Sequence, residues 1–312
     1  MKERIHYLDI TKGVLILCLM LSHFNSATQR LGVEYEWFKI INYWTPFFAC
    51  FFMQCFFFIS GYCSNFQLST LFFIKKQIKQ IIVPLLAFEI IGQLLGFLYW
   101  NDFSYNYLCP PNTTLWFLIA LLFARIYCFV SVNYIKRVPI YLGLSLILLF
   151  IALFINQYNI IPNYFAFLNC LAACFWVSLG YVLKEVGINN RILLYGAITY
   201  ITLIVLLKYF NLTVPILDAG VSNVGWKYFP LIILLATSGS FACILISKWI
   251  NKCRFLEYFG KNSIIVYCIH FVPLLLCIKY YLNLVTPNNV LSMLLLTILI
   301  YGTLLLILIF FI

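Results

Sequence analysis

The chain has 312 residues, of which 64% are hydrophobic and 9% are charged, with a formal net charge of +11 at pH 7. This composition excludes the soluble globular classes, because apolar runs long enough to cross a bilayer recur along the whole sequence. The positive charge does not indicate nucleic-acid binding, since the basic residues are spread over short loops between apolar segments. We therefore expect an all-α, polytopic integral membrane protein with one domain over residues 1–312, in contact with membrane lipids and with no nucleic-acid partner.

Hydrophobic patterning predicts about ten membrane-spanning helices. Their expected positions are 7–27, 44–64, 79–100, 113–133, 138–156, 163–184, 191–208, 226–247, 262–283 and 289–312. If the N-terminus is inside, fourteen Lys and Arg residues lie on the cytoplasmic side and five on the opposite side. This asymmetry places both termini in the cytoplasm by the positive-inside rule.

The first predicted span carries an acid, a base and an imidazole, namely Asp9, Lys12 and His23. Ionisable groups inside a membrane are costly and are therefore functional candidates. The eleven residue steps from Lys12 to His23 make about 1100°, within about 20° of three helical turns, so the two side chains share one face about 16 Å apart. Asp9 lies one turn before Lys12, where it is placed to pair with the lysine and not with His23. The structural alternative is a snorkelling lysine together with a histidine that only forms hydrogen bonds with neighbouring helices.

The second predicted span contains Ser60, Gly61 and Tyr62 in an aromatic run. Small residues there either let two helices approach closely, which is the commoner case, or break the helix so that its backbone lines a cavity. A basic cluster, Lys75, Lys76 and Lys79, follows at the predicted inner face. Such clusters usually meet anionic lipid headgroups, but this one could also hold the phosphates of a cytosolic cofactor.

Later spans contribute a few further candidates. Trp116 opens the fourth span, which also carries Arg125, and a guanidinium at membrane depth needs a partner, for which Glu89 of the third span is the simplest choice. His270 lies near the middle of the ninth span, where a histidine that satisfies a neighbour's hydrogen bond is the commoner case. The twelve cysteines form no CxxC pair and indicate small buried residues, so we expect no metal site.

Taken together, several blocks resemble the acyltransferase family 3 membrane proteins, in the order in which that family has them. The blocks are Tyr7–Gly13 with His23, Phe56–Tyr62, Lys75–Pro84, Leu115–Leu118, Gly180–Tyr181, and Phe259–Ser263 with His270. The resemblance runs from the first span to the ninth, and the predicted span count agrees with it.

The resemblance implies a membrane O-acyltransferase of a bacterial cytoplasmic membrane. It would move an acyl group, with acetyl-CoA as the expected donor, from the cytosol to a hydroxyl of an extracytoplasmic sugar, cell-surface polysaccharide or lipid-linked sugar. His23 would then be the general base, since the ordinary pKa of histidine lies near neutrality. Asp9, paired with Lys12, would be the second catalytic residue. The cofactor phosphates would be held by Lys12, Lys75, Lys76 and Lys79. The cavity and the acceptor site would be lined by Ser60, Tyr62, Trp116, Arg125 and His270, with Arg125 serving either the oxyanion or a structural pair.

The sequence departs from the family at three places. Lys12 stands where the family often has arginine, Phe52-Met53-Gln54 replaces a frequent His-Met-Pro, and Gln77 and Gln80 occupy two of the plausible positions of a frequent arginine pair. The rival function from another class is a transporter or flippase of a lipid-linked sugar or small solute, because ten helices with buried charges also suit a substrate pathway. Against it, no inverted pair of short or broken segments is visible between the two halves.

Overall fold

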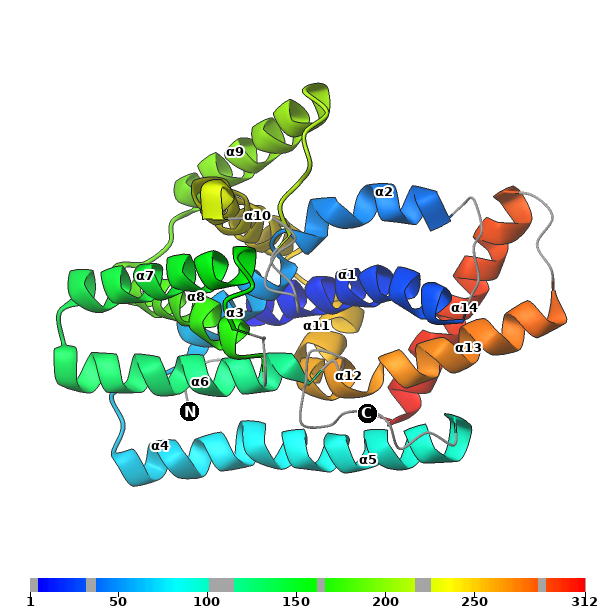
Figure 1. The fold of residues 1–312 in the computed structure, drawn as a ribbon, viewed down its shortest axis with the longest axis horizontal. Coiled ribbons are helices and arrows are strands. Elements are labelled where there is room, and N and C mark those ends of the chain that lie inside the picture. Colours follow the sequence, from blue (N-terminus) through cyan, green and yellow to red (C-terminus); the bar gives the residue numbers. More distant parts are fainter. Residues whose placement is uncertain are drawn as a thin grey trace. The chain divides into compact units, whose positions relative to one another are not determined.

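The structure is a computed structural model, and it describes residues 5–31, 38–100, 115–161, 166–216, 226–285 and 290–311. Within these ranges the regular secondary structure is helical, which confirms the predicted all-α fold (Figure 1). Contacts between Cα atoms divide the chain into two compact units. Unit 1 comprises Met1–Phe48 and Lys252–Ile312, and unit 2 comprises Ala49–Asn251. A single functional domain over residues 1–312 stays a prediction.

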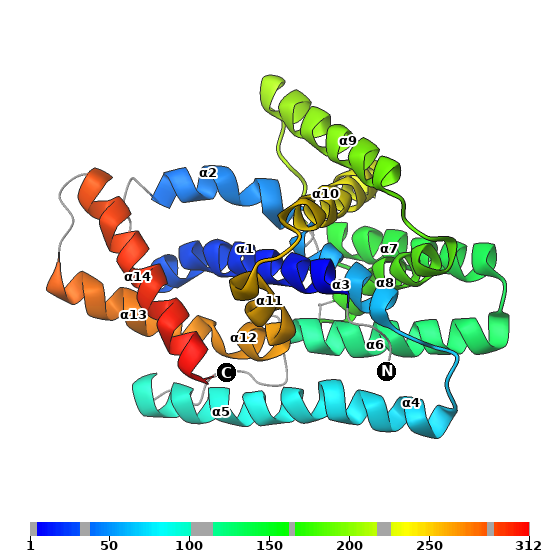
Figure 2. The ribbon, with the colours of Figure 1, turned by 180° about the vertical axis from the view of Figure 1, so that it is seen from behind.

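Unit 1 is built around α1, the first helix of the chain. Its helices are α1 (His6–Arg30), α2 (Phe38–Ala49, which reaches the boundary), α11 (Arg254–Lys261), α12 (Ser263–Ile269), α13 (Phe271–Leu284) and α14 (Val290–Phe311). The N-terminal part of α1 packs against α11, its later turns contact α12 and α13, and α13 packs against α14. Figure 2 shows α11 crossing α1 from the rear side of the molecule. The start of the chain therefore folds against a segment that lies about 250 residues later in the sequence.

Unit 2 is built around α8. Its helices are α3 (Phe52–Cys63), α4 (Thr70–Gln77), the π-helix η1 (Ile78–Ile82), α5 (Val83–Trp100), α6 (Trp116–Val130), the π-helix η3 (Ser131–Ile135), α7 (Val138–Gln157), α8 (Phe167–Val186), α9 (Asn190–Tyr209), the 3-10 helix η5 (Trp226–Tyr228) and α10 (Phe229–Ile250). α8 packs against α3, α6 and α7, while α10 packs against α9 and α3. Most residues of α8 are accordingly buried.

The described helices support a protein that crosses the membrane many times. Eight helical segments are long and apolar enough to span a bilayer, one of them (Tyr43–Cys63) formed by part of α2 together with α3. The bent pair α12–α13 makes a ninth candidate if it counts as one span. These nine coincide with nine of the ten predicted spans. The remaining one, predicted at 79–100, falls on α5, whose side chains are described only in part. The cytoplasmic location of both termini stays a prediction.

The outer faces of the spans are apolar, as expected for contact with lipid. On α9, Ile198, Ile201 and Val205 are exposed, and on α14 the same holds for Ile298 and Leu306. Large aliphatic side chains at this exposure would be unfavourable in water but are well solvated by hydrocarbon. The pattern agrees with the composition of the chain.

In unit 2 a pair of glycines brings α3 and α8 into backbone contact. A Cβ on Gly61 would collide with the carbonyl oxygen of Val177, and a Cβ on Gly180 would collide with the carbonyl oxygen of Phe58. Each glycine therefore leaves room for the backbone of the facing helix at one crossing point, as small residues do where membrane helices pack closely. Of the two interpretations of the Ser60-Gly61 step, the packing one is confirmed for Gly61.

Candidate active site

The predicted pair at the start of α1 is present. Nζ of Lys12 lies 2.8 Å from Oδ1 of Asp9, three residues earlier on the same helix. The Asp9 side chain is 5% exposed and that of Lys12 is 23% exposed, so the lysine covers a carboxylate that is almost out of contact with solvent. Because α1 continues without a break to Arg30, His23 lies three turns beyond Lys12, as the spacing predicts.

Further along α1, His23 forms a hydrogen bond with the second predicted histidine. Nε2 of His270 lies 2.9 Å from Nδ1 of His23. His270 is completely buried, whereas His23 is partly exposed. The rings of His23 and Phe271 are perpendicular, with centroids 5.6 Å apart. The structure thus brings together two candidates that the sequence separates by 247 residues.

The hydrogen bonds around this pair determine where its protons lie. Nδ1 of His270 is 2.8 Å from the carbonyl oxygen of Tyr267 and 3.1 Å from that of Val266. A carbonyl can only accept, so Nδ1 of His270 carries the hydrogen, and in the neutral ring Nε2 is the acceptor. Nδ1 of His23 must then donate, which leaves Nε2 of His23 with a free lone pair. Nε2 makes no protein hydrogen bond within the described segments, so the arrangement can accept a proton there.

His270 lies at a break that the sequence interpretation missed. The ninth predicted span is not one straight helix, because α12 ends at Ile269, α13 begins at Phe271, and the two axes differ by 51°. The cause is Pro273, whose ring clashes with the carbonyl of the residue four positions earlier and removes a helical hydrogen bond. Pro273 itself was the available signal, since a proline inside a predicted span indicates a kink at the preceding turn.

The contact between α1 and α11 repeats the glycine arrangement seen in unit 2. A Cβ on Gly13 would collide with the carbonyl oxygen of Leu256, and a Cβ on Gly260 would collide with that of Asp9. Both glycines belong to blocks that carry the family resemblance. Their close approach fixes the part of α1 that holds Asp9 and Lys12.

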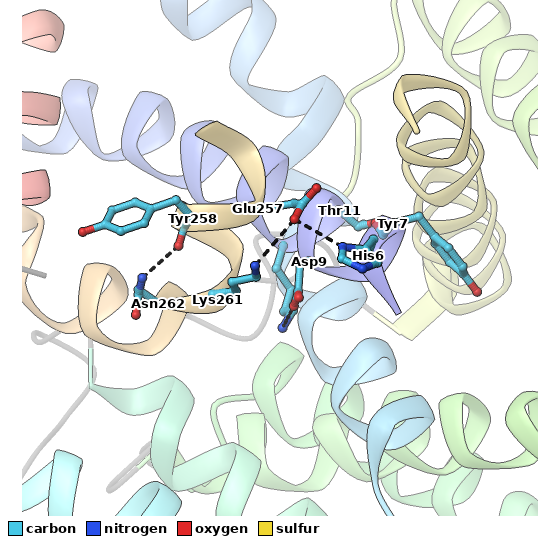
Figure 3. A network of polar contacts seen from close by, with 9 residues as sticks. His6, Tyr7, Asp9, Thr11, Glu257, Tyr258, Lys261 and Asn262 are labelled. Atoms are coloured by element: carbon cyan, nitrogen blue, oxygen red, sulfur yellow. Dashed lines mark hydrogen bonds and ion pairs between the residues drawn. The ribbon is translucent and has the colours of Figure 1, made fainter. Parts of the chain in front are cut away.

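A polar network at the same crossing was also missed. Figure 3 shows Glu257 of α11 between His6 of α1 and Lys261 of its own helix. Nδ1–H of His6 donates to Oε2 of Glu257 over 3.3 Å, and Nζ of Lys261 lies 3.5 Å from the same oxygen. The hydrogen bond from His6, and then the positive charges, lower the pKa of Glu257 below its ordinary value. No local pattern points to this network, because His6 and Glu257 are 251 residues apart.

The remaining site candidates belong to unit 2, and the structure joins two of them. Nε of Arg125 donates to Oγ of Ser60 over 3.0 Å, and Nη1 lies 3.4 Å from Oε1 of Gln77 and 3.3 Å from Oε1 of Gln80. The guanidinium is therefore paired with neutral acceptors, and the expected partner Glu89 is not one of its contacts among the described residues.

The predicted phosphate-binding lysines lie on the same stretch as these glutamines. Lys75 and Lys76 are on α4 and Lys79 is on η1. Lys75 and Lys79 are exposed, and Lys76 is partly exposed. Their role in holding a cofactor stays a prediction.

Trp116 and Tyr62 lie in aromatic packing. Trp116 is 7% exposed, and its ring centroid lies 6.4 Å from that of Phe57. The Tyr62 ring stacks on Phe58 at 6.3 Å. Neither contact joins them to Ser60 or Arg125, and their proposed roles toward an acceptor stay predictions. In the described segments, no group of three or more His, Cys, Asp or Glu side chains could hold a metal ion.

Comparison with known proteins supplies the family. Residues 5–312 match the acyltransferase 3 family, whose description is an acyltransferase domain. Comparisons with curated proteins and with solved structures gave no match. The family match covers both units and nearly the whole chain, and it agrees with the ordered blocks, the helical fold and the many candidate spans. The chain therefore belongs to the acyltransferase 3 family and is a membrane acyltransferase.

Proposed function

We propose that the protein transfers an acyl group from a cytosolic acyl-CoA, with acetyl-CoA as donor, to a hydroxyl of an extracytoplasmic sugar, and that His23 is the general base. The observation that carries this proposal is the hydrogen bond between His23 and His270. It supports a tautomer in which Nε2 of His23 is unprotonated and makes no protein hydrogen bond within the described segments. An imidazole in that state can take a proton from a hydroxyl at neutral pH.

The reaction then balances as a simple acyl exchange. The hydroxyl proton of the acceptor moves to Nε2 of His23 while the hydroxyl oxygen attacks the thioester carbonyl. When the tetrahedral intermediate collapses, the carbon–sulfur bond breaks and the imidazolium returns the proton to the leaving thiolate. The products are an acyl ester of the sugar and free CoA, and His23 regains its starting form.

His270 has a separate part in this proposal. It does not touch the reacting atoms, because both of its ring nitrogens are engaged, one by backbone carbonyls and one by His23. It orients the His23 ring and shares the positive charge that forms when Nε2 of His23 is protonated. This is the role of the third group in a nucleophile–base–orienting arrangement, which keeps the base in its working tautomer.

The deciding experiment uses purified protein in nanodiscs. Radiolabelled acetyl-CoA and succinyl-CoA are supplied with sugars of capsule, lipopolysaccharide and secreted polysaccharide, and both CoA release and label transfer are measured. We expect His23→Ala to lower the transfer rate about 10²- to 10⁴-fold, the usual contribution of a general base. His6→Gln is the matched histidine control and should keep the wild-type rate. Transfer at the wild-type rate by His23→Ala would disprove the assignment.

The membrane orientation belongs to the same proposal. Both termini are proposed to be cytoplasmic in a bacterial cytoplasmic membrane, which follows from the fourteen-to-five distribution of basic residues. Fusion of a cytosol-dependent reporter and of a periplasm-dependent reporter to either end tests it. Activity of the periplasmic reporter at both termini would reverse the orientation.

A further inference from the structure

Among the residues that the structure describes, no carboxylate contacts the guanidinium of Arg125 in unit 2. The side chain is partly buried, and its partners within the described segments are Oγ of Ser60 and Oε1 of Gln77 and Gln80. All three acceptors are uncharged. By contrast, Lys12 contacts the carboxylate of Asp9, and Lys184 contacts that of Glu185. A cation in a membrane protein is normally paired, so an uncompensated guanidinium calls for an anion.

The hydrogen-bond count shows which edge of the guanidinium is available. Arginine has five N–H donors. Nε–H is used by Ser60, and the two hydrogens of Nη1 are used by Gln77 and Gln80, one each. The two hydrogens of Nη2 have no acceptor within the described segments, and Nη2 is not one of the buried polar atoms without a partner. This edge therefore faces space that a molecule from outside those segments can occupy.

The surroundings of this edge favour a phosphate. The two glutamines come from α4, which runs beside α6 in both Figure 1 and Figure 2, and from η1, which contacts α6. The same stretch carries the exposed Lys75 and Lys79. η1 is a π-helix, a rare element that occurs frequently at functional sites. A guanidinium fixed by three hydrogen bonds and flanked by lysines suits the oxygens of a phosphate, which accept charge-assisted hydrogen bonds.

We propose that Arg125, held by Ser60, Gln77 and Gln80, is the anchor of a binding site for a phosphate ester in unit 2. The ligand presents one phosphate group to Nη2, and Lys75 and Lys79 add attraction at longer range. Two sources have this chemistry, the phosphates of an acyl-CoA and the headgroup of an anionic phospholipid. The inference rests on the proposed function only for the first of these sources.

The test compares substitutions that keep the fold but remove the open charge. Gln80→Glu places a carboxylate 3.3 Å from Nη1, so that it balances Arg125 from within the chain. Arg125→Gln removes the charge. Gln67→Glu is the control, because it makes the same change at an exposed side chain of the preceding loop. Thermal unfolding of each variant reports on folding.

Binding is measured without any chemistry, so that its result is independent of catalysis. Unacylated CoA and adenosine 3′,5′-bisphosphate are titrated into protein in nanodiscs of phosphatidylcholine alone, and retention of phosphatidylglycerol is followed by native mass spectrometry. We expect Gln80→Glu and Arg125→Gln to weaken one of these ligands about ten- to a hundredfold, the effect of losing hydrogen bonds to a charged group. Gln67→Glu should bind as the wild type does.

Each outcome has a defined meaning. A loss confined to CoA and the bisphosphate assigns the site to the donor, and a loss confined to phosphatidylglycerol assigns it to a lipid headgroup. Wild-type affinity for all three ligands in Gln80→Glu, with an unfolding temperature equal to or above that of the wild type, overturns the inference and leaves Arg125 a structural residue. In that case His23-dependent acyl transfer would still stand. Conversely, if CoA binding depends on Arg125 but no acyl transfer is detected, the binding site is supported and the proposed reaction is contradicted.

Discussion

Nε2 of His270 and Nδ1 of His23 lie 2.9 Å apart, and the other nitrogen of His270 is held by the carbonyl oxygens of Tyr267 and Val266. A backbone carbonyl therefore fixes the proton of one imidazole, and that imidazole fixes the proton of the next. The direction of these hydrogen bonds matters, because it leaves Nε2 of His23 with a lone pair. If His270 were turned around, His23 would present an N–H and could not act as a base.

The first prediction separates orientation from packing at His270. In His270→Gln an amide oxygen replaces the Nε2 acceptor, whereas His270→Leu has no acceptor. We expect His270→Leu to lower kcat about 10²-fold or more, because His23 loses the partner that sets its tautomer. His270→Gln should recover a large part of that loss at a similar unfolding temperature. The pH profile of kcat should change in His270→Leu and approach the wild-type profile in His270→Gln. Equal kcat values for the two variants would mean that His270 only fills space.

The second prediction concerns the kink at His270. Pro273→Ala provides the missing N–H, so the hydrogen bond to the carbonyl of Ile269 can form and α12 and α13 can straighten. The bend of 51° that points His270 at His23 would be reduced. We expect lower kcat with an equal or higher unfolding temperature, a combination that a merely destabilising change cannot give. Wild-type kcat in Pro273→Ala would show that the bend is unnecessary for the histidine pair.

The helices were predictable because each span is encoded locally. A run of apolar residues identifies a membrane helix without reference to the rest of the chain. The glycine crossings were predictable only in part. The Ser60-Gly61 step indicates a close approach, but nothing in it names Val177 or Gly180 as the partner, since that choice depends on three-dimensional packing.

The site follows the same division. The pair of Asp9 with Lys12 was predictable because residues three positions apart on a helix are neighbours. His23 and His270 were each identified by their position inside a span, but their hydrogen bond joins opposite ends of the chain. The same holds for Arg125, whose glutamine partners are neutral and therefore gave no charge signal to search for.

The third prediction distinguishes the two roles open to Lys12. Lys12→Met leaves the nearly buried Asp9 without its lysine, so the unfolding temperature should fall, with a cost of about 1–3 kcal/mol. The double variant Asp9→Asn with Lys12→Met removes both charges and should recover most of that stability. If Lys12 also binds the donor, KM for acyl-CoA stays raised in the double variant. Recovery of both stability and KM would limit Lys12 to pairing with Asp9.

The fourth prediction uses the backbone contact between α3 and α8. Gly61→Ala and Gly180→Ala each add a methyl group where a carbonyl oxygen of the facing helix already lies. We expect each to lower stability by about 1–3 kcal/mol, the usual cost of overpacking. Gly143→Ala is the matched control, since a Cβ on this helical residue of α7 has no neighbour within 4 Å. There the better helix propensity of alanine should leave stability unchanged or raise it by up to about 1 kcal/mol. Equal unfolding temperatures for all three variants in one detergent would contradict the crossing.

The fifth prediction is a dependence of stability on pH at the crossing of α1 and α11. The hydrogen bond from His6 and the charge of Lys261 lower the pKa of Glu257 in the folded protein below the ordinary value of 4.5. A depressed folded pKa means that the unfolded chain binds the proton more readily, so the contribution is present above about pH 4.5 and is lost as the pH falls through the folded pKa. The unfolding temperature of the wild type should therefore drop on acidification below this point, while Glu257→Gln should start lower at neutral pH and lose less. Parallel curves for the two proteins across the acid range would show that Glu257 does not stabilise the fold through its charge.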